Sequence, residues 1–414
     1  MSEQGVPPVR VTDLKVVLTA PEGIRLVVVK IETDQPGLVG WGCATFTQRP
    51  LAVATALEEY LRPFIIGRDV DRIDDFYQAA FVSSYWRSGP VLNNALSGVD
   101  QALWDIKGKR AGMPVYQLIG GKVREAVPVY VHASGATFED VEEGARRFME
   151  QGFRHIRCQV GIPGLTTYGS RGGEVVKAYD PKQERTWEPT PYVRTAPKLF
   201  EHLRKTLGED IELLHDVHER IPPIQGVWLA KALEEYRLFF LEDLFAPEDN
   251  DYFHMVRAQT STPLAMGELY VNQAEYVPMI RERLIDFIRC HISDIGGFTM
   301  ARKLAAFCEF MGVRTAWHGP GDVSPIGHMA NFHLDIATPN FGIQELSLGM
   351  YRGHTPEVFV GLPEVRDGAV WLSDKPGWGM EVNEEEAAKY PFPEHPLAGA
   401  WPEVRRIDGT VVKP

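Results

Sequence analysis

Three apolar runs that each lead into a carboxylate decide the fold of this chain: HDVHE (215–219), FFLEDLFAPED (239–249) and PLAMGEL (263–269). Their acids follow one another at a constant interval of 26 residues (216 to 242, then 242 to 268), at Asp216, Glu242 and Glu268. A strand, a helix and the two loops that join them take roughly that many residues. We therefore expect three consecutive βα units that each carry an acid at the same point.

The three acids are candidate metal ligands. The carboxyl ends of neighbouring parallel strands lie at one edge of a sheet, so Asp216, Glu242 and Glu268 are expected to converge. A set of hard oxygen ligands suits Mg²⁺, whereas Zn²⁺ would favour histidine and cysteine. The alternative is that the acids are unrelated, and that each caps a helix or pairs with an arginine at the surface.

Short apolar runs recur along the whole second part of the chain. They lie at 128–134, 155–160, 211–217, 239–243, 263–268, 285–293, 312–318 and 341–345, and helical stretches separate most of them. Eight strands in this rhythm predict an α/β fold, a TIM-like barrel, better than they predict an open sheet. A doubly wound nucleotide-binding fold is the structural alternative, but no glycine-rich phosphate-binding motif follows any of these runs.

The first 125 residues follow a different pattern and predict a separate α+β unit. Residues 10–45 alternate in strand fashion and include a Gly-rich turn, PGLVGWG (36–42), which predicts an antiparallel meander. Beyond Leu51 the pattern is helical until Gly112 and Pro114. This helical stretch carries apolar residues on one face, at Leu96, Val99, Leu103 and Ile106.

Two further segments stand outside the strand rhythm. Residues 161–195 are rich in Gly, Pro and polar residues and leave the C-terminal end of a barrel strand, so we expect a lid over the active site. Residues 356–414 contain a hairpin signal at Asp367-Gly368, a helical AAKY segment and a Pro-rich tail. We therefore place the barrel at 126–355 and expect the C-terminal segment to cover the N-terminal unit.

Composition and charge restrict the classes of partner. The chain has 414 residues and a formal net charge of −13, which argues against nucleic acid and against an anionic membrane surface. The four cysteines are scattered without a metal-binding spacing, as in a reduced cytoplasmic protein. The sequence shows no signal-peptide pattern and no apolar run of spanning length. We expect a cytoplasmic protein whose partner is a small molecule.

Residues near the predicted strand ends add candidates for acid–base chemistry. His218 lies two residues from Asp216, so in a strand both would point the same way, and the imidazole could protonate a leaving hydroxide. Arg157 closes the second strand and Tyr168 follows in the long loop, where a guanidinium would lower the pKa of the phenol and make it a usable base. Polar residues at other strand ends suit a polyhydroxylated anion: His132, Arg289, His318, Asp322 and Glu345. The alternative for each residue is an ordinary ion pair or hydrogen bond.

The motifs resemble the enolase superfamily in its mandelate-racemase-like branch. The resemblance rests on the carboxylate series, on SGVDQALWDIKGKRAGMPVYQLIGG (97–121) and on SDIGG (293–297). It implies a modified TIM barrel, (β/α)7β, that carries Mg²⁺, and a capping domain (1–125) completed by the C-terminal segment. Enzymes of that superfamily use Mg²⁺ to stabilise an enediolate. Racemases of the branch carry K-x-K at the end of strand two, but this chain has Arg157-Cys158-Gln159 there.

Within that branch, the chain is similar to the mannonate dehydratase family. The similarity rests on RCQ (157–159), the loop from GIPG to Tyr168, HDVHE (215–219) and WHGPGDVSP (317–325). It implies that D-mannonate is dehydrated to 2-keto-3-deoxy-D-gluconate by a homo-oligomer. The implied roles are Mg²⁺ ligands for Asp216, Glu242 and Glu268, base for Arg157 with Tyr168, acid for His218, and contacts with the sugar acid for His132, Arg289, His318, Asp322 and Glu345.

The chain departs from that family at three places. Thr47 stands where the family has Asn, Pro320 stands where it has Ala, and the tail GTVVKP (409–414) lacks a terminal Trp. Threonine lacks the amide's donor and acceptor pair, and proline stiffens the loop after His318 and removes an N–H group. We therefore expect a weak dehydratase that accepts D-gluconate, the C2 epimer, beside or instead of D-mannonate.

Two other functions stay open at the level of the sequence. One is a sugar-acid racemase or epimerase of the same superfamily, with His318 and Asp294 as its catalytic dyad. The other is a catalytically poor barrel that serves as a regulatory or ligand-binding protein. An intact set of site residues does not distinguish this last function from that of an enzyme, because the presence of the residues does not prove turnover.

Overall fold

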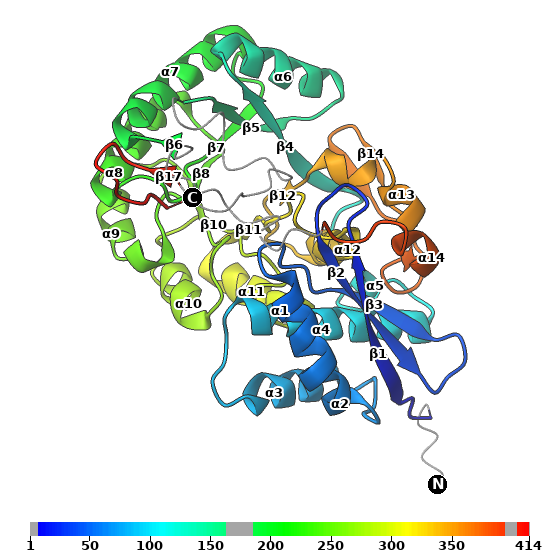
Figure 1. The fold of residues 1–414 in the computed structure, drawn as a ribbon. Helices are drawn as coiled ribbons and strands as arrows, with labels where there is room; N and C mark the ends of the chain where they lie inside the picture. Colours follow the sequence, from blue (N-terminus) through cyan, green and yellow to red (C-terminus); the bar gives the residue numbers. More distant parts are fainter. Residues whose placement is uncertain (1–6, 163–184, 394–403, 414) are drawn as a thin grey trace.

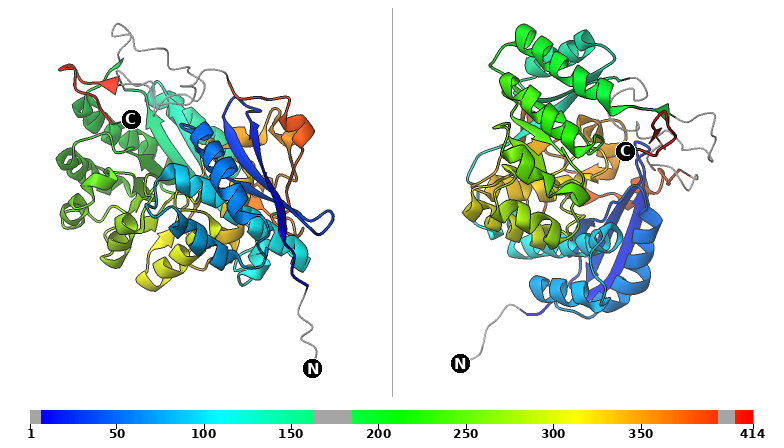
Figure 2. Two further views of the ribbon diagram at one scale, coloured as in Figure 1. Left: turned by 60° about the horizontal axis from the view of Figure 1, so that its bottom comes forward. Right: turned by 90° about the vertical axis from the view of Figure 1, so that its left-hand side faces the viewer.

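The molecule consists of two units that pack side by side (Figures 1 and 2). The structure is a computed structural model that describes residues 7–162, 185–393 and 404–413. The N-terminal unit is blue and cyan, and the barrel runs from blue-green through yellow to orange. Among the described helices, none combines the length and the apolar character of a membrane span.

The N-terminal unit is an antiparallel meander covered by helices, as predicted. β1 (Val11–Thr19) pairs with β2 (Leu26–Thr33), which pairs with β3 (Val39–Cys43). The helices follow in chain order: α1 (Pro50–Thr55), η1 (Ala56–Leu61), α2 (Arg62–Ile65), α3 (Ile73–Ser83), α4 (Pro90–Ala111) and α5 (Val115–Leu118). α4 buries the predicted apolar face and ends at Gly112 in the left-handed conformation.

The predicted Gly-rich turn at 36–42 is wrong in its second half, because Val39–Cys43 form the third strand. Two glycines let the backbone of α4 approach this strand. A Cβ added at Gly42 would lie 1.9 Å from the carbonyl oxygen of Gly98, and one added at Gly40 would lie 2.1 Å from that of Ala102. Glycine is needed here for the close packing of a strand on a helix.

The second unit is a barrel of parallel strands: β4 (Val127–Gly135), β5 (His155–Val160), β7 (Glu212–Asp216), β8 (Phe240–Glu242), β9 (Leu264–Met266), β10 (Phe287–Ile288), β11 (Arg314–Thr315) and β12 (Gln344–Glu345). Each strand from β4 to β10 pairs with the next one in this series. β12 pairs with β4, and a parallel bridge between Thr315 and Phe341 closes the ring. The predicted strand order is confirmed, although most of the strands are shorter than the apolar runs.

A helix follows each barrel strand except the last and covers its outer side (Figure 1). These helices are α6 (Phe138–Glu150), α7 (Pro189–Leu207), α8 (Pro223–Leu233), α9 (Tyr252–Arg257), α10 (Gln273–Arg281), α11 (Phe298–Met311) and α12 (Pro325–Ala337). Short 3₁₀ turns lie at η2 (Glu234–Tyr236), η3 (Pro247–Asp249) and η4 (Leu348–Tyr351). The order of elements is that of the expected (β/α)7β barrel.

The barrel interior is apolar in the layer beneath the predicted site. The layer consists of Tyr130, Leu214, Phe240, Ala265, Phe287, Ala316 and Ile343. Leu214 and Phe240 stand two residues before Asp216 and Glu242, so they point the same way one step deeper in the barrel. The ring centroids of Phe240 and Phe287 are 5.1 Å apart. This apolar floor fixes the strand ends that carry the acids.

The predicted loop at 161–195 is wrong at its C-terminal end. α7 begins at Pro189, so residues 189–195 are helical. Proline at the first helical position costs no hydrogen bond, because the first N–H groups of a helix have no intrahelical partner. Just before this helix, β6 (Arg185–Thr186) pairs with β17 (Val404–Arg405). The predicted lid falls mostly on residues 163–184, which lie outside the described residues.

The C-terminal segment contacts both units. The predicted hairpin is present as β14 (Glu364–Arg366) and β15 (Ala369–Trp371), and β15 pairs with β4 of the barrel. The remaining elements are α13 (Thr355–Val358), β13 (Phe359–Val360), β16 (Glu381–Val382) and α14 (Glu384–Ala387). Trp378 Nε1 donates to the carbonyl of Trp41 at 3.1 Å, and Trp41 Nε1 donates to Glu381 at 2.7 Å. The region around Trp378 and Glu381 therefore packs on the meander, while the hairpin extends the barrel sheet.

Gly42→Ala should lower the free energy of unfolding by about 1–3 kcal/mol or more, because the added methyl group would overlap the Gly98 carbonyl of α4. Gly144→Ala is the matched control, since its Cβ would meet the Ala133 Cβ at 3.5 Å, an ordinary contact. Urea denaturation followed by circular dichroism measures both variants. Wild-type stability in Gly42→Ala would contradict the close approach of α4 to β3.

Candidate active site

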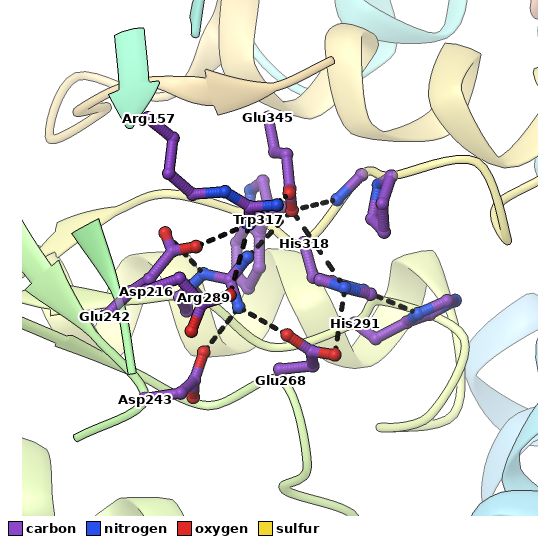
Figure 3. Close-up of polar contacts among 12 residues, drawn as sticks. Arg157, Asp216, Glu242, Asp243, Glu268, Arg289, His291, Trp317, His318 and Glu345 are labelled. Carbon is purple, nitrogen blue, oxygen red and sulfur yellow. Dashed lines mark hydrogen bonds and ion pairs between the residues drawn. The ribbon is translucent and has the colours of Figure 1, made fainter. Parts of the chain in front are cut away.

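The predicted site residues gather at the carboxyl end of the barrel strands. The strand register places them: Asp216 lies opposite Glu242 in the β7–β8 pair, and His132 lies opposite Arg157 in the β4–β5 pair. Figure 3 shows most of the group around one centre: Arg157, Asp216, Glu242, Glu268, Arg289, His318 and Glu345. The equal spacing of the acids in the sequence is therefore matched by their convergence in space.

The Arg157 guanidinium bridges three carboxylates. Its Nη1 atom lies 2.6 Å from Glu242 Oε1, 3.1 Å from Glu345 Oε1 and 3.3 Å from Asp216 Oδ2. The three carboxylate side chains are fully buried and the Arg157 side chain is 4% exposed. The sequence predicted Arg157 beside Tyr168, which lies outside the described residues. Arg157 also belongs to the carboxylate cluster itself.

Arg289 holds the other side of this cluster. Its Nη1 atom lies 2.5 Å from Asp243 Oδ2 and 2.8 Å from Glu268 Oε2. Its Nη2 atom lies 2.7 Å from Glu345 Oε2. The Arg289 side chain is fully buried, so its charge is neutralised by these carboxylates and not by water.

Asp243 and Tyr130 are members of the cluster that the sequence analysis missed. Alternation along a strand would place Asp243 on the opposite face from Glu242. β8 ends at Glu242, however, and Asp243 has a φ of 43°, so its carboxylate also reaches Arg289. Tyr130 belongs to the apolar floor, yet its hydroxyl donates to Glu242 at 3.0 Å and accepts from Arg289 at 3.2 Å.

The cluster carries an excess of negative charge, because two guanidinium groups face five carboxylates. Burial raises the pKa of Glu242 to about 8 and that of Asp243 to about 6, against the opposing effect of Arg289. Burial also acts upward on Glu345, but Arg289 and the neighbouring cations hold the pKa of that carboxyl well below its usual range. A raised pKa shows that the two guanidinium groups do not fully compensate the negative charge of the cluster, and a divalent cation would add positive charge there.

The chemistry of the predicted trio fits Mg²⁺. Asp216, Glu242 and Glu268 offer only carboxylate oxygens, the ligands that this ion prefers. Within the described residues, the group whose possible ligand atoms all lie within 4.8 Å of one another is a different one: His291, His318 and Asp322. Two imidazoles and one carboxylate form a softer set that suits a transition metal better than Mg²⁺. The oxygen-only trio is therefore the better candidate for Mg²⁺.

A pocket of about 450 Å³ lies between the barrel and the N-terminal unit. The barrel lines it with His218, Glu219, Glu268, Leu269, His291, Asp294, His318 and Asp322. The loop after β3 lines the other side with residues 45–49. Thr47 is buried in this loop, and its hydroxyl donates to Gln48 Oε1 at 3.0 Å. The N-terminal unit therefore supplies part of the site wall.

His218 reaches the pocket for a different reason from the one predicted. Strand alternation does not apply, because β7 ends at Asp216 and His218 has a φ of 53°. The backbone N–H of His218 donates to Asp216 Oδ1 at 2.8 Å and ties the turn to that carboxylate. The Nε2 atom of His218 lies 3.7 Å from Glu268 Oε1. The imidazole therefore stands beside the predicted metal ligands.

His132 and Asp322 lie where the sequence predicted them, at the mouth of the barrel. His132 Nε2 is 2.9 Å from Glu345 Oε1, and burial together with the charge of Arg157 lowers the pKa of this imidazole. Asp322 lines the pocket, and its buried Oδ1 has no hydrogen-bond partner in the described part of the chain. An unpartnered buried acceptor is costly, so this position suits a hydroxyl group of a ligand.

His318 lies between a carboxylate and a second imidazole. Its Nε2 atom is 3.3 Å from Glu268 Oε1, and its Nδ1 atom is 3.0 Å from His291 Nδ1. Asp294, the dyad partner in the racemase hypothesis, instead accepts a hydrogen bond from Asn94 of α4. Among the described residues, no hydrogen bond joins Asp294 to His318. The partner of His318 is therefore His291, which the sequence analysis missed.

Two family models match the chain. Residues 5–120 match the mandelate racemase / muconate lactonizing enzyme N-terminal domain. Residues 140–387 match the enolase C-terminal domain-like family. These matches confirm the superfamily that the motifs predicted.

Relatives of known name match along nearly the whole chain. It is 53% identical to the D-galactonate dehydratase family member RspA of Pantoea ananatis, over 98% of this chain and 99% of the relative. It is 50% identical to a D-galactonate dehydratase family member of Enterocloster bolteae, with the same coverage. A crystal structure of an enolase from Pantoea ananatis with bound D-gluconate and Mg matches with a TM-score of 0.91 and 51% identity, over 98% of this chain and 100% of that chain. The chain therefore belongs to the enolase superfamily, in its mandelate racemase / muconate lactonizing enzyme branch, and to the D-galactonate dehydratase family of sugar-acid dehydratases.

Proposed function

We propose that this protein is a Mg²⁺-dependent hydro-lyase that converts D-mannonate, D-gluconate or both to 2-keto-3-deoxy-D-gluconate. One observation carries the proposal. Asp216 and Glu242 stand side by side at the ends of β7 and β8, and Glu268 follows β9, in a cluster whose five carboxylates outnumber its two guanidinium groups. The adjoining pocket of about 450 Å³ has the polar lining that a polyhydroxylated anion needs.

Asp216, Glu242 and Glu268 would hold Mg²⁺. The ion would supply positive charge next to the substrate carboxylate, which would lower the free energy of the negative charge that develops when the C2 proton leaves. Arg289 would orient the Glu268 ligand, because its Nη1 lies 2.8 Å from Glu268 Oε2. Tyr130 would orient Glu242 in the same way, through a hydrogen bond of 3.0 Å. Such supporting hydrogen bonds fix the direction of metal ligands.

We assign removal of the C2 proton to Arg157 and Tyr168. A positive charge beside a phenol stabilises the phenolate and lowers its pKa, so that the side chain becomes a usable base. Arg157 is held for this role by Glu242 at 2.6 Å and Glu345 at 3.1 Å. Because Arg157 is almost fully buried, water screens its charge only weakly.

We assign departure of the C3 hydroxyl to His218. The imidazole donates a proton, the hydroxyl leaves as water, and the remaining enol tautomerises to the 2-keto-3-deoxy acid. C2 becomes the carbonyl carbon, so the C2 epimers D-mannonate and D-gluconate give the same product. The hydrogen bond from the His218 backbone to Asp216, at 2.8 Å, fixes the distance between this acid and the proposed metal site.

The residues proposed to contact the sugar acid are His132, Arg289, His318, Asp322 and Glu345. Glu345 joins most of this set, since it lies 2.9 Å from His132 and 2.7 Å from Arg289, and it also accepts the Gly319 N–H at 3.1 Å. A carboxylate fixed on several sides loses little entropy when a hydroxyl group binds to it. Asp322 Oδ1, which has no hydrogen-bond partner among the described residues, offers a further acceptor.

The substrate assignment has two lines of support. The D-gluconate found in the Pantoea ananatis structure supports a six-carbon acid sugar for this pocket. The motifs resemble mannonate dehydratases, whereas the relatives carry the family name D-galactonate dehydratase. D-Galactonate therefore belongs in the set of substrates to be tested.

The environments of Thr47 and Pro320 are the reason to expect a low rate of dehydration. Thr47 lines the pocket, but its hydroxyl is used by Gln48, so it offers less to a ligand than an amide would. Pro320 has no N–H group, and it directly follows Gly319, whose N–H binds Glu345. A misplacement on the order of an ångström can cost about a hundredfold in rate.

The predicted cytoplasmic location and homo-oligomeric state remain part of this proposal. The four cysteines are free and buried, which agrees with a reducing compartment. Large apolar side chains are exposed on the N-terminal unit, among them Tyr60, Tyr85 and Trp86. Such residues are common in interfaces between subunits.

Glu242→Gln should abolish turnover and weaken Mg²⁺ binding by at least about a hundredfold, because a ligand and a negative charge are both lost. Asp243→Asn is the matched control, since Asp243 is a buried neighbour that also binds Arg289 but is not a proposed ligand. Calorimetric titration with Mg²⁺ alone should show the smaller loss of affinity in Asp243→Asn. An equal loss of Mg²⁺ affinity in both variants would show that this affinity depends only on the total charge of the cluster.

Tyr168→Phe should stop both dehydration and exchange of the C2 proton with solvent, because the proposed base is lost. His218→Asn should stop dehydration but leave C2 exchange measurable, because only the acid for the C3 hydroxyl is lost. Proton NMR of D-mannonate and D-gluconate in D₂O separates the two steps. Wild-type exchange in Tyr168→Phe would show that the base lies elsewhere.

Purified, Mg²⁺-loaded protein should dehydrate D-mannonate and D-gluconate slowly in a panel of six-carbon acid sugars that includes D-galactonate. Pro320→Ala should raise kcat/KM for D-mannonate by about tenfold, because it frees the loop after His318. The assay measures formation of the 2-keto-3-deoxy acid. Efficient turnover of D-mannonate alone would contradict the expected low rate and the acceptance of D-gluconate. Binding of these acids without turnover would favour a regulatory protein.

A further inference from the structure

His291 is a buried histidine at the site to which the proposed reaction gives no role. It follows β10, is 5% exposed, and lines the pocket together with His318, which is 3% exposed. The Nδ1 atoms of the two rings are 3.0 Å apart, and their ring planes are inclined at 41°. Figure 3 shows the contact on the side of His318 that faces away from Arg157.

The short distance between the two Nδ1 atoms requires one proton between them. Two lone pairs, or two N–H groups, at 3.0 Å would repel each other, so one ring donates and the other accepts. The Nε2 atom of His291 is buried and has no hydrogen-bond partner among the described residues. The contact with His318 is therefore the hydrogen bond that the structure gives to the ring nitrogens of His291.

The other nitrogen of His318 faces carboxylates. Its Nε2 atom lies 3.3 Å from Glu268 Oε1 and 4.0 Å from Glu345 Oε2. A lone pair at Nε2 would be repelled by both acids, so this nitrogen carries a proton. The conclusion holds for either direction of the bond to His291. If Nδ1 of His318 accepts, the neutral ring carries its proton on Nε2, and if Nδ1 donates, the ring is an imidazolium with a proton on both nitrogens.

We propose that His291 is a positioning residue for His318: the hydrogen bond between the two Nδ1 atoms fixes the His318 ring with a protonated Nε2 turned to the pocket. His291 is thereby the partner of His318 that the racemase hypothesis expected in Asp294, whose carboxylate instead accepts a hydrogen bond from Asn94 of α4. A neutral imidazole partner adds no negative charge, so it orients His318 without making it a stronger base. The use of that donor on an acid sugar rests on the proposed function; the positioning itself does not.

The direct test is NMR of the metal-free full-length protein labelled with ¹⁵N in its histidines. We expect a scalar coupling between Nδ1 of His291 and Nδ1 of His318 across the hydrogen bond, and a proton on Nε2 of His318. His318→Gln assigns the signals by removing them. These readouts need no turnover, so they hold or fail independently of the proposed reaction.

Two substitutions separate positioning from packing. His291→Phe keeps a ring of similar volume but has no nitrogen, whereas His291→Asn can place an amide group near the position of Nδ1. We expect KM for the acid sugar to rise by about tenfold in His291→Phe, with a smaller change in kcat, and by less than about threefold in His291→Asn. Thermal unfolding of both variants reports any loss of packing.

Four results would overturn the proposal. The first is the absence of the coupling between the two Nδ1 nuclei in the wild-type protein. The second is an unprotonated Nε2 in His318. The third is tight binding of Zn²⁺ that requires His291, His318 and Asp322 together, since the close approach of these side chains would then serve a metal site. The fourth is an equal KM in His291→Phe and the wild type.

Discussion

Two buried guanidinium groups hold the site together. Arg157 and Arg289 contact the five carboxylates of the cluster, at Asp216, Glu242, Asp243, Glu268 and Glu345. Without them, acids at this separation would repel one another and take up protons, because a charged group that is removed from water is destabilised. A guanidinium offers several donors in a fixed plane, so one side chain can satisfy acids from different strands. The barrel can therefore bring its acidic strand ends together and still leave the cluster short of the positive charge that a metal ion supplies.

The sequence predicted the features that repeat or that depend on neighbouring residues. The interval between Asp216, Glu242 and Glu268 was informative because each βα unit repeats the same geometry, so equal spacing becomes equal position in the barrel. The end of α4 at Gly112 followed from local backbone preference, and the hairpin from its Asp367-Gly368 turn. In these cases the residues that determine the structure lie within a few positions of the sequence motif that predicted it.

The features that the sequence did not predict depend on contacts with distant segments or on irregular backbone. Gly42 was interpreted as part of a turn, because the approach of α4 is not visible locally. Asp243 was not among the predicted residues, and strand alternation would not have indicated it, because the positive φ of this residue breaks the alternation. His291 stands two residues after Arg289, so alternation could have indicated it, but β10 ends before both residues. For these positions, the sequence limits which residues could belong to the site or to a close contact. The backbone conformation then decides which of them do.

The helix α4 connects the substrate pocket with the packing of the two units. On one side, its backbone lies against β3, whose continuation forms the pocket loop 45–49. On the other side, Ser97 binds Ser293 at 3.0 Å, and Asp100 accepts the Thr299 N–H at 2.8 Å, in the segment that follows His291. A shift of this helix would therefore move the capping loop relative to the carboxylate cluster. Because the barrel supplies the acids and the loop supplies the opposite wall, such a shift would change which acid sugar fits before it changed the chemistry.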